Sequence, residues 1–268
     1  SEIISGDSRQ VYQGLDIGSG KDLAEYGDVP YHLIDIIEPG KEYNAFRFQR
    51  DFTTAFNEIQ QRDKLPLLVG GTGLYIDAVV AGYEFSEVDK DLELRAELDA
   101  MPLADVQAML VQLKPQQHNE TDLTVRPRLY RAIEIARAEQ QGIKSDFKLP
   151  QINPIYFGIK WDRKILRERI TFRLKQRLEE GMVEEVQGLL DQGISHEKLE
   201  YFGLEYRFVS QYIAGELTYD DMFKKLNTAI HQYAKRQDTW FRRMERNGAQ
   251  IHWLDGTRDI VEQAQHYL

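Results

Sequence analysis

The chain has 268 residues, of which 42% are apolar and 11% aromatic, so it is long enough to bury one substantial core and too apolar to be disordered. It contains no cysteine, which excludes a disulfide framework, a thiolate metal site and a cysteine nucleophile. A net charge of −10 argues against non-specific binding to nucleic acid, although residues 160–177 and 224–246 are locally basic.

Two stretches near the N-terminus have the composition of buried strands. Glu2–Ser5 runs into Gly6-Asp7-Ser8, and residues 65–69 run into Gly70-Gly71-Thr72-Gly73. Residues 32–37 are a third candidate strand, and residues 44–62 form an amphipathic helix between strands, with Phe46, Phe52, Phe56 and Ile59 near helical spacing. The order strand, helix, strand, helix predicts a right-handed parallel α/β sheet.

The pattern is helical from Ser86 to about Gly142 and returns to a strand at residues 152–161. Two long helices are predicted at residues 163–192 and 219–247, a last strand at 250–254 and a closing helix at 259–268. We therefore expect an α/β core made of residues 1–84 and 151–268, with a helical insert at 85–150. The longest apolar stretches, at residues 65–69 and 78–81, are far shorter than the roughly 20 residues of a membrane span, so we expect a cytoplasmic protein.

The sequence LPLLVGGTGLY at residues 65–75 is the clearest local signal. A strand that turns into a helix through Gly71-Thr72-Gly73 presents backbone N–H groups, a positive helix end and a hydroxyl to one point, which suits a phosphate oxygen. A tight turn whose glycines only relieve backbone strain explains the same residues. Both interpretations are open from these residues alone.

Asp7 directly follows the first strand, so in a parallel sheet it lies at the edge where ligand sites concentrate. A carboxylate there can hold Mg²⁺ or accept a proton. The alternative, which is commoner for a single Asp after a strand, is that Asp7 caps a following helix.

The string Gly18-Ser19-Gly20-Lys21 is not a phosphate-binding P-loop, because Leu15 stands at the first glycine position and Asp22 at the Ser/Thr position. It is predicted to be a surface loop. Two basic stretches remain ambiguous: residues 232–243 interleave Lys and Arg with Tyr and Trp, as RNA recognition requires, and Arg169, Arg173 and Arg177 share one helix face that could clamp a diphosphate. Alone, each is more simply explained as an amphipathic helix with a solvated basic face.

Seven stretches in order resemble the tRNA dimethylallyltransferase family, also called tRNA isopentenyltransferases. They are EIISGDSRQVYQGLDIGSGK, VPYHLIDI, LPLLVGGTGLYIDAVVAG, RPRLYRAIEI, FRLKQRLEEGMVEEV, FGLEYR and QYAKRQDTWFRR, and they run across nearly the whole chain. Each is weak by itself, whereas the ordered set is specific.

The resemblance implies an α/β fold with a P-loop-NTPase-like parallel sheet flanked by helices and carrying a helical insert. It implies transfer of a dimethylallyl group from dimethylallyl diphosphate to N6 of the adenine beside a tRNA anticodon, with Mg²⁺ as cofactor, by a protein expected to be a monomer. Asp7 would accept the proton, and Gly71, Thr72 and Arg173 would bind the diphosphate. The residues that would contact tRNA are Ser8, Arg9, Gln10, Arg95, Arg128, Arg131, Gly203, Tyr206, Arg207, Lys235 and Arg236.

Family members open with a strand, a P-loop and a helix, and none of these stands before Ser1. We expect this 268-residue form to be inactive or nearly so and a longer parent to be a prenyltransferase, because Glu2–Ser5 would otherwise lack a neighbouring strand. Two other functions are open: a small-molecule phosphotransferase of the P-loop kinase type, and a non-catalytic RNA-binding derivative of the enzyme.

Overall fold

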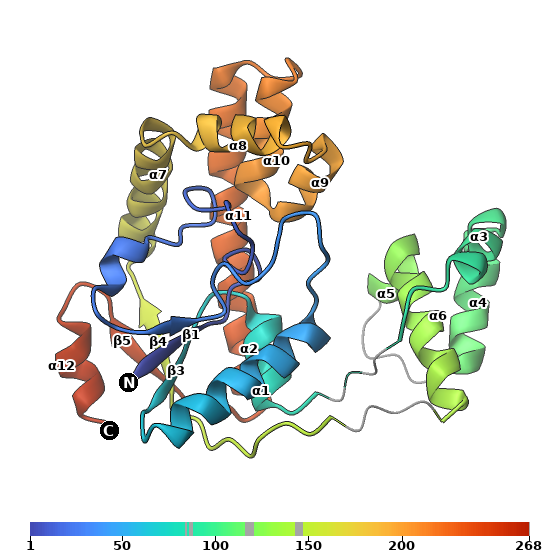
Figure 1. Ribbon diagram of the computed structural model, residues 1–268, viewed down its shortest axis with the longest axis horizontal. Helices are drawn as coiled ribbons and strands as arrows, with labels where there is room; N and C mark the ends of the chain where they lie inside the picture. The colour runs from blue at the N-terminus through green and yellow to red at the C-terminus, as the bar shows by residue number, and fades with distance from the viewer. Residues whose placement is uncertain (84, 86–87, 116–120, 143–146, 268) are drawn as a thin grey trace. The chain divides into compact units, whose positions relative to one another are not determined.

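The computed structural model describes every residue except 84, 86–87, 116–120, 143–146 and 268. The chain separates into two compact units (Figure 1). Ser1–Gly82 and Leu149–Leu268 make the first, and Tyr83–Lys148 make the second. The second unit and the insert predicted at 85–150 overlap almost entirely, while the predicted boundary at residue 84 and the start of the helical pattern at Ser86 fall outside the described residues.

Parallel strands form two sheets in the first unit. One sheet has the order β2-β1-β3, made by Tyr31–His32, Glu2–Ser5 and Pro66–Val69, and the other pairs β4 (Tyr156–Lys160) with β5 (Ile251–Asp255). The predicted α/β class with a parallel sheet and flanking helices is confirmed. The expectation that Glu2–Ser5 lacks a neighbour is wrong, because β1 is paired along both of its edges.

Helix α1 (Ala45–Gln61) follows the first sheet and begins at Asn44, whose side chain accepts a hydrogen bond from the Arg47 N–H at 2.9 Å. It buries Phe48, Phe52, Phe56 and Ile59 at helical spacing, so Phe48 takes the place predicted for Phe46. Helix α2 (Gly73–Val80) leaves the end of β3 and packs on α1.

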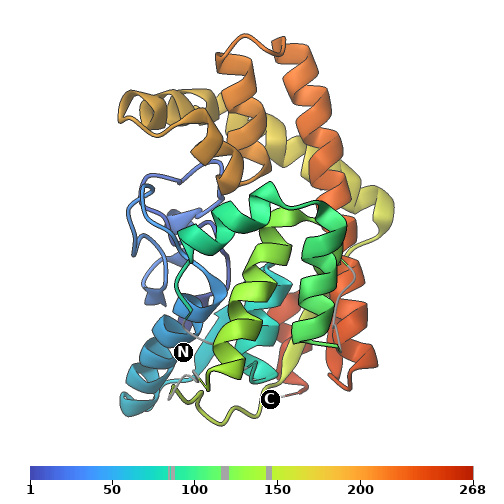
Figure 2. The same ribbon diagram turned by 90° about the vertical axis from the view of Figure 1, so that its right-hand side faces the viewer.

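Six helices cover the C-terminal part of the first unit. They are α7 (Arg163–Glu179), α8 (Met182–Asp191), α9 (His196–Phe202), α10 (Leu204–Ile213), α11 (Tyr219–Arg246) and α12 (Ile260–Gln265). The single helix predicted over 163–192 is therefore wrong: Gly181 has a φ of +104°, a conformation that interrupts the helical backbone and is open chiefly to glycine. At 28 residues α11, the orange-red helix in Figure 2, is the longest helix of this unit, and it packs along α7, α10 and α2.

Aromatic and aliphatic side chains from both halves of the sequence share the core of the first unit. Tyr12 and Phe48 from the N-terminal part lie in one buried cluster with Phe202, Val209 and Leu226 from the C-terminal helices. Burial of this apolar surface, at roughly 25 cal/mol per Å², fixes α9, α10 and α11 against the end of the first sheet.

The second unit is entirely helical in its described part. It contains α3 (Leu92–Ala100), α4 (Leu103–Leu113), α5 (Thr121–Thr124) and α6 (Arg126–Gln140), which bury a core of their own that includes Leu98, Leu110, Leu129 and Ile133. Within the described residues of both units, no helix has the length and apolar character needed to cross a bilayer.

Candidate active site

The carboxyl ends of β1 and β3 bring Asp7 and Thr72 together. Ser5 pairs with Val69 in register, and the Gly6 N–H donates to the Val69 carbonyl at 2.7 Å. Two residues further, the Ser8 N–H donates to Thr72 Oγ1 at 3.2 Å. The loops that follow the two strands are thus joined, as the positions of both residues after parallel strands predicted.

Close approach of the two loops depends on glycine at position 70. A Cβ added to Gly70 would lie 2.5 Å from the carbonyl carbon of Gly6, a backbone atom that cannot rotate away. The close packing of the two strand ends is therefore enough to explain why the first residue of the Gly-Gly-Thr-Gly string is glycine, and no ligand needs to be invoked.

Asp7 directly precedes a turn that begins at Ser8, and its Oδ1 accepts a hydrogen bond from the Arg9 N–H at 2.7 Å. No helix follows it, so the alternative that Asp7 caps a helix is wrong. Burial raises the pKa of Asp7, and the backbone N–H groups of Arg9 and Gln10 together with the charges of Arg9 and Arg177 oppose that rise without cancelling it.

Thr72 stands at the start of α2, but its hydroxyl does not cap that helix. Instead, Thr72 Oγ1 accepts from the Ser8 N–H and lies 3.5 Å from Ser8 Oγ. The positive end of α2 and two hydroxyl groups therefore meet beside Asp7, which is an arrangement suited to a phosphate oxygen.

The three arginines of α7 have different environments. Arg169 stacks on the Trp161 ring, with 4.1 Å from Cζ to the ring centroid, and Arg177 is buried against Gly20 and pairs with Asp22 at 3.5 Å. Between them, Arg173 forms no salt bridge to a carboxylate in the described part of the chain. Burial and the charge of Arg177 lower the pKa of Arg173, while Glu205 and Asp22 act in the opposite direction.

Sequence reasoning missed two titratable groups near Asp7. Burial raises the pKa of Glu205, at the start of α10, against the lowering effect of Arg177 and Arg173. Burial also raises the pKa of Tyr233 on α11, and the charge of Asp7 adds to that effect. No local sequence motif marks Glu205 or Tyr233. Their place near Asp7 is apparent only from the structure, in which α10 and α11 lie close to the end of the first sheet.

The predicted tRNA contacts near Asp7 divide by exposure. Arg9 reaches the Tyr201 ring at 5.0 Å and passes close to Gly203, while Gln10 is held internally by Ser5 and by the Gly20 carbonyl. The side chains of Arg207, Lys235 and Arg236 are exposed.

Tyr206 requires a correction. Only 1% of it is exposed, its ring packs on Gly18, and its hydroxyl donates to Glu185 at 2.8 Å. These contacts leave no ring face on which an RNA base could stack, so Tyr206 holds α10 in place instead of contacting tRNA.

In the second unit, the predicted arginines surround one buried carboxylate. Arg95 donates to both oxygens of Glu134, at 2.6 and 3.0 Å, and Arg131 donates to Glu134 at 3.2 Å and to the Val88 carbonyl at 2.7 Å. Arg128 is exposed on α6. Two of the three predicted contacts are therefore engaged within the unit itself.

The charged group of the segment Gly18–Lys21 forms contacts within the protein and is not available to a phosphate. Lys21 is buried, pairs with Asp16 at 2.6 Å and with Asp35, and donates to the Tyr12 carbonyl at 2.8 Å. Its ammonium group therefore has three partners, which agrees with rejecting a P-loop here but places the lysine in the interior instead of on a surface loop.

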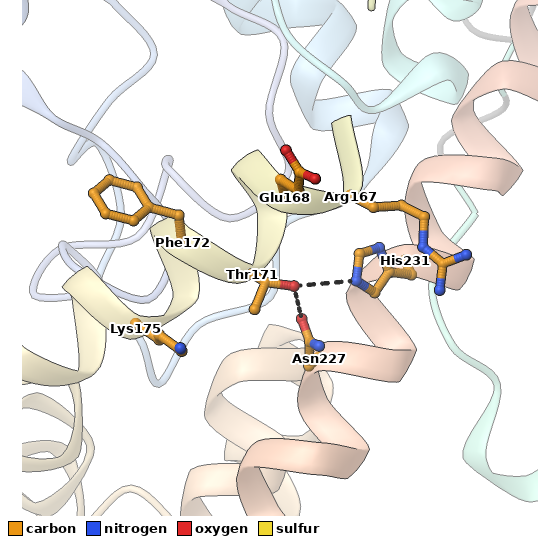
Figure 3. Close-up of a pocket in the computed structure, with 7 residues that line it drawn as sticks. All are labelled: Arg167, Glu168, Thr171, Phe172, Lys175, Asn227 and His231. Carbon is orange, nitrogen blue, oxygen red and sulfur yellow. Dashed lines mark hydrogen bonds between the residues drawn. The ribbon is translucent and has the colours of Figure 1, made fainter. Parts of the chain in front are cut away.

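A shallow depression of about 540 Å³ lies between α7 and α11 (Figure 3). It is lined by Arg167, Glu168, Thr171, Phe172, Lys175, Asn227 and His231, and Thr171 Oγ1 donates to Asn227 Oδ1 at 3.0 Å. Thr171 and Lys175 are each two residues from Arg173, about 200° around the helix, so this depression lies on the opposite face of α7 from Arg173.

The IPP transferase family model matches residues 10–244 of the chain. The chain is 69% identical over 267 residues to tRNA dimethylallyltransferase 2 of Shewanella sediminis, covering 100% of this chain and 89% of that protein. It is 58% identical over 261 residues to tRNA dimethylallyltransferase 2 of Syntrophotalea carbinolica, covering 97% and 88% respectively.

Solved structures have the same fold. The full-length tRNA isopentenylpyrophosphate transferase of Bacillus halodurans superposes with a TM-score of 0.70 at 32% identity, covering 100% of this chain and 86% of that one. A eukaryotic dimethylallyltransferase acting on tRNA gives a TM-score of 0.78 at 20% identity, covering 100% and 71%, which supports the fold alone. From the family match and these identities, the chain belongs to the IPP transferase family, in which its curated relatives are tRNA dimethylallyltransferases.

Proposed function

We propose that this protein transfers a dimethylallyl group from dimethylallyl diphosphate to N6 of the adenine beside a tRNA anticodon. The observation that carries the proposal is that the loops after β1 and β3 are joined where the Ser8 N–H donates to Thr72, next to the buried Asp7, whose carboxyl group also feels the charge of Arg177 on α7. A carboxylate, a helix N-terminus and guanidinium groups in one place match the two demands of the reaction, which are removing a proton and stabilising a leaving diphosphate.

In the proposed step, the N6 lone pair of adenine attacks C1 of the dimethylallyl group. The bond from C1 to the bridging oxygen breaks, and its electron pair leaves with the diphosphate. The proton lost from N6 passes to the Asp7 carboxylate. Since an exocyclic aryl amine is a weak nucleophile and must leave its base stack to react, a positioned base beside the pocket favours the reaction.

Gly71, Thr72 and Arg173 are the proposed diphosphate ligands. The Thr72 hydroxyl and the start of α2 supply donors. In the described structure Arg173 has neither a salt bridge nor an aromatic ring contact, whereas Arg177 pairs with Asp22 and Arg169 stacks on Trp161. A guanidinium with no carboxylate partner can pair two oxygens of a diphosphate in a planar, bidentate geometry.

Magnesium fits this site as a partner of the diphosphate, not as an ion held by a protein cage. The described residues contain no group of three His, Asp or Glu side chains that could hold a metal by themselves. Asp7 and the Thr72 and Ser8 hydroxyls offer oxygen ligands, and Mg²⁺ is commonly held by one or two carboxylates together with substrate phosphates. When bound, Mg²⁺ would neutralise charge on the departing diphosphate.

For tRNA, we propose contacts from Arg9, Arg207, Lys235 and Arg236, whose positions around the site leave their charges able to reach phosphates. We further propose that one copy of the chain suffices and that the reaction takes place in the cytoplasm, where tRNA is found.

The test is prenylation of unmodified tRNA by the full-length protein with dimethylallyl diphosphate and Mg²⁺. We expect prenylated adenosine with the wild-type protein and a loss of about 10²- to 10⁴-fold for Asp7→Asn, the usual contribution of a general base. Asp28→Asn, an exposed carboxylate, is the matched control and should be unchanged. Consumption of a nucleoside triphosphate without RNA would instead identify a phosphotransferase, and tRNA binding without transfer would identify a non-catalytic derivative.

A further inference from the structure

One face of α11 changes character along its length. Met222, Leu226 and Ile230 pack into the core of the first unit at helical spacing. The same stripe then continues through Tyr233, Gln237 and Trp240 before Met244 is buried again. Gln237 is the one polar residue in this stretch of the stripe, and a buried amide destabilises the fold unless it is hydrogen-bonded. The hydrogen-bond partner of Gln237 therefore indicates its role.

The partner is the backbone of the predicted diphosphate turn. Gln237 Nε2 donates to the Gly71 carbonyl at 3.0 Å, and a Cβ added to Gly71 would overlap that same nitrogen. Three residues along the helix, the indole of Trp240 packs so closely on Gly73 that a Cβ there would overlap the ring. Two glycines of the string Gly-Gly-Thr-Gly are thus explained by side chains of α11.

We propose that Gln237 and Trp240 are positioning residues for the diphosphate, a role that rests on the proposed prenyl transfer. They hold the Gly71–Gly73 turn from the side of α11. A trans peptide is planar with its C=O and N–H pointing in opposite directions, so tying the Gly71 carbonyl to Gln237 aims the Thr72 N–H away from α11. The Trp240 ring fixes the next peptide by contact, and the turn is pre-organised to receive phosphate oxygens.

The indole of Trp240 supports this assignment. Its Nε1 is one of two buried side-chain polar atoms without a partner in the described residues. A buried donor without an acceptor destabilises the fold, so the ring is held there despite its polar edge. Packing on Gly73 accounts for why a ring of this shape occupies the position.

The first experiment separates the two substrates. Gln237→Ala should raise KM for dimethylallyl diphosphate about fivefold, the equivalent of one neutral hydrogen bond, with KM for tRNA unchanged. Trp240→Ala should act in the same direction, and Trp240→Phe should recover most of the loss because the aromatic contact is kept. Gln60→Ala, an exposed glutamine on α1, should leave both KM values unchanged.

The second experiment tests the contact itself. Gly71→Ala should raise KM for the diphosphate, because the new methyl group displaces the Gln237 amide. Adding Gln237→Ala to it makes room, so the double variant should be no worse than Gln237→Ala alone. Gly70→Ala is the matched control, since its methyl group meets the Gly6 backbone and no change at Gln237 can relieve that contact.

Either of two results would overturn the positioning role. One is strictly additive KM effects of Gly71→Ala and Gln237→Ala. The other is a rise in KM for tRNA instead of the diphosphate, which would make Gln237 an RNA contact. If the wild-type protein transfers no prenyl group, the proposed function itself is refuted. That outcome cannot be confused with the other two, because the KM values of the variants are compared only with those of an active wild-type protein.

Discussion

Asp7 is a carboxylate whose surroundings oppose its charge. Burial raises its pKa above the ordinary value of 3.8, although the backbone N–H groups of Arg9 and Gln10 and the charges of Arg9 and Arg177 partly compensate. As a base, Asp7 works only when ionised. The rate limited by proton removal should therefore fall as the pH drops through this raised pKa, at a pH above the usual range of an aspartate.

The burial of Asp7 also predicts that removing its charge stabilises the protein while it reduces activity. A carboxyl whose pKa is raised by folding contributes stability at pH values below its unfolded pKa, and that contribution is lost as the pH rises through its folded pKa. Asp7→Asn should therefore raise the free energy of unfolding at pH 7 while slowing transfer about 10²- to 10⁴-fold. The gain should shrink in acid, where Asp7 itself is protonated; chemical denaturation at pH 7 and pH 4 measures the difference. Equal or lower stability of the variant at pH 7 would contradict the burial described.

Glu185 shows how one carboxylate joins separate elements. From α8 it accepts hydrogen bonds from the backbone N–H groups of Asp16, Ile17 and Gly18, at 3.0, 2.6 and 3.0 Å, and another from the Tyr206 hydroxyl. It therefore fixes the loop before Lys21 and the start of α10 at the same time. Three N–H groups converging on one anion would form an anion site if the protein did not fill it itself.

We expect Glu185→Gln to cost about 1–3 kcal/mol, because an amide replaces one acceptor oxygen by a donor that faces N–H groups. Glu184→Gln, which changes an exposed neighbour on the same helix, should cost far less. Urea denaturation of both variants gives the comparison. Equal losses would show that the Glu185 contacts do not contribute to stability.

At the level of elements, periodicity predicted most of the fold. The helices α1 and α11 have apolar residues at helical spacing that the core buries, and Ile4 of the strand Glu2–Ser5 is buried as well. The strand Pro66–Val69 was also predicted, although its Leu67 and Val69 side chains are exposed. The predicted helix over 163–192 failed at Gly181, because apolar spacing continues on both sides of a glycine that breaks the backbone. Helices α9 and α10 were not predicted, since each is short and its burial depends on distant partners.

The charge of the whole molecule places a condition on tRNA binding. With a net charge of −10, the protein must attract a polyanion through local cations such as Lys235 and Arg236 on α11. The double variant Lys235→Ala/Arg236→Ala should raise KM for tRNA and flatten its dependence on salt concentration, because fewer counterions are released on binding. KM for the diphosphate should not change. If the dependence of KM for tRNA on salt concentration is unchanged in this variant, Lys235 and Arg236 do not contact the RNA phosphates.

The candidate site was only partly predictable from the sequence. Asp7 and Thr72 could be placed together because each follows a parallel strand, and the structure joins their loops through Ser8. The parts played by Gln237 and Trp240 could not be predicted, because they depend on which face of α11 meets the Gly71–Gly73 turn. The family resemblance placed Tyr206 among the RNA contacts, and only its burial shows otherwise.

The close approach of Gly70 to Gly6 has a consequence for how sequences of this fold diverge. Any descendant that keeps β1 and β3 in register must keep glycine at position 70, whatever substrate it uses, because a side chain there meets backbone. Invariance of that glycine across relatives would measure inheritance of the strand pairing and not of the chemistry. Thr72 is the more informative position, because the strand pairing does not require its side chain. Its hydroxyl can therefore be replaced in a relative that catalyses a different reaction.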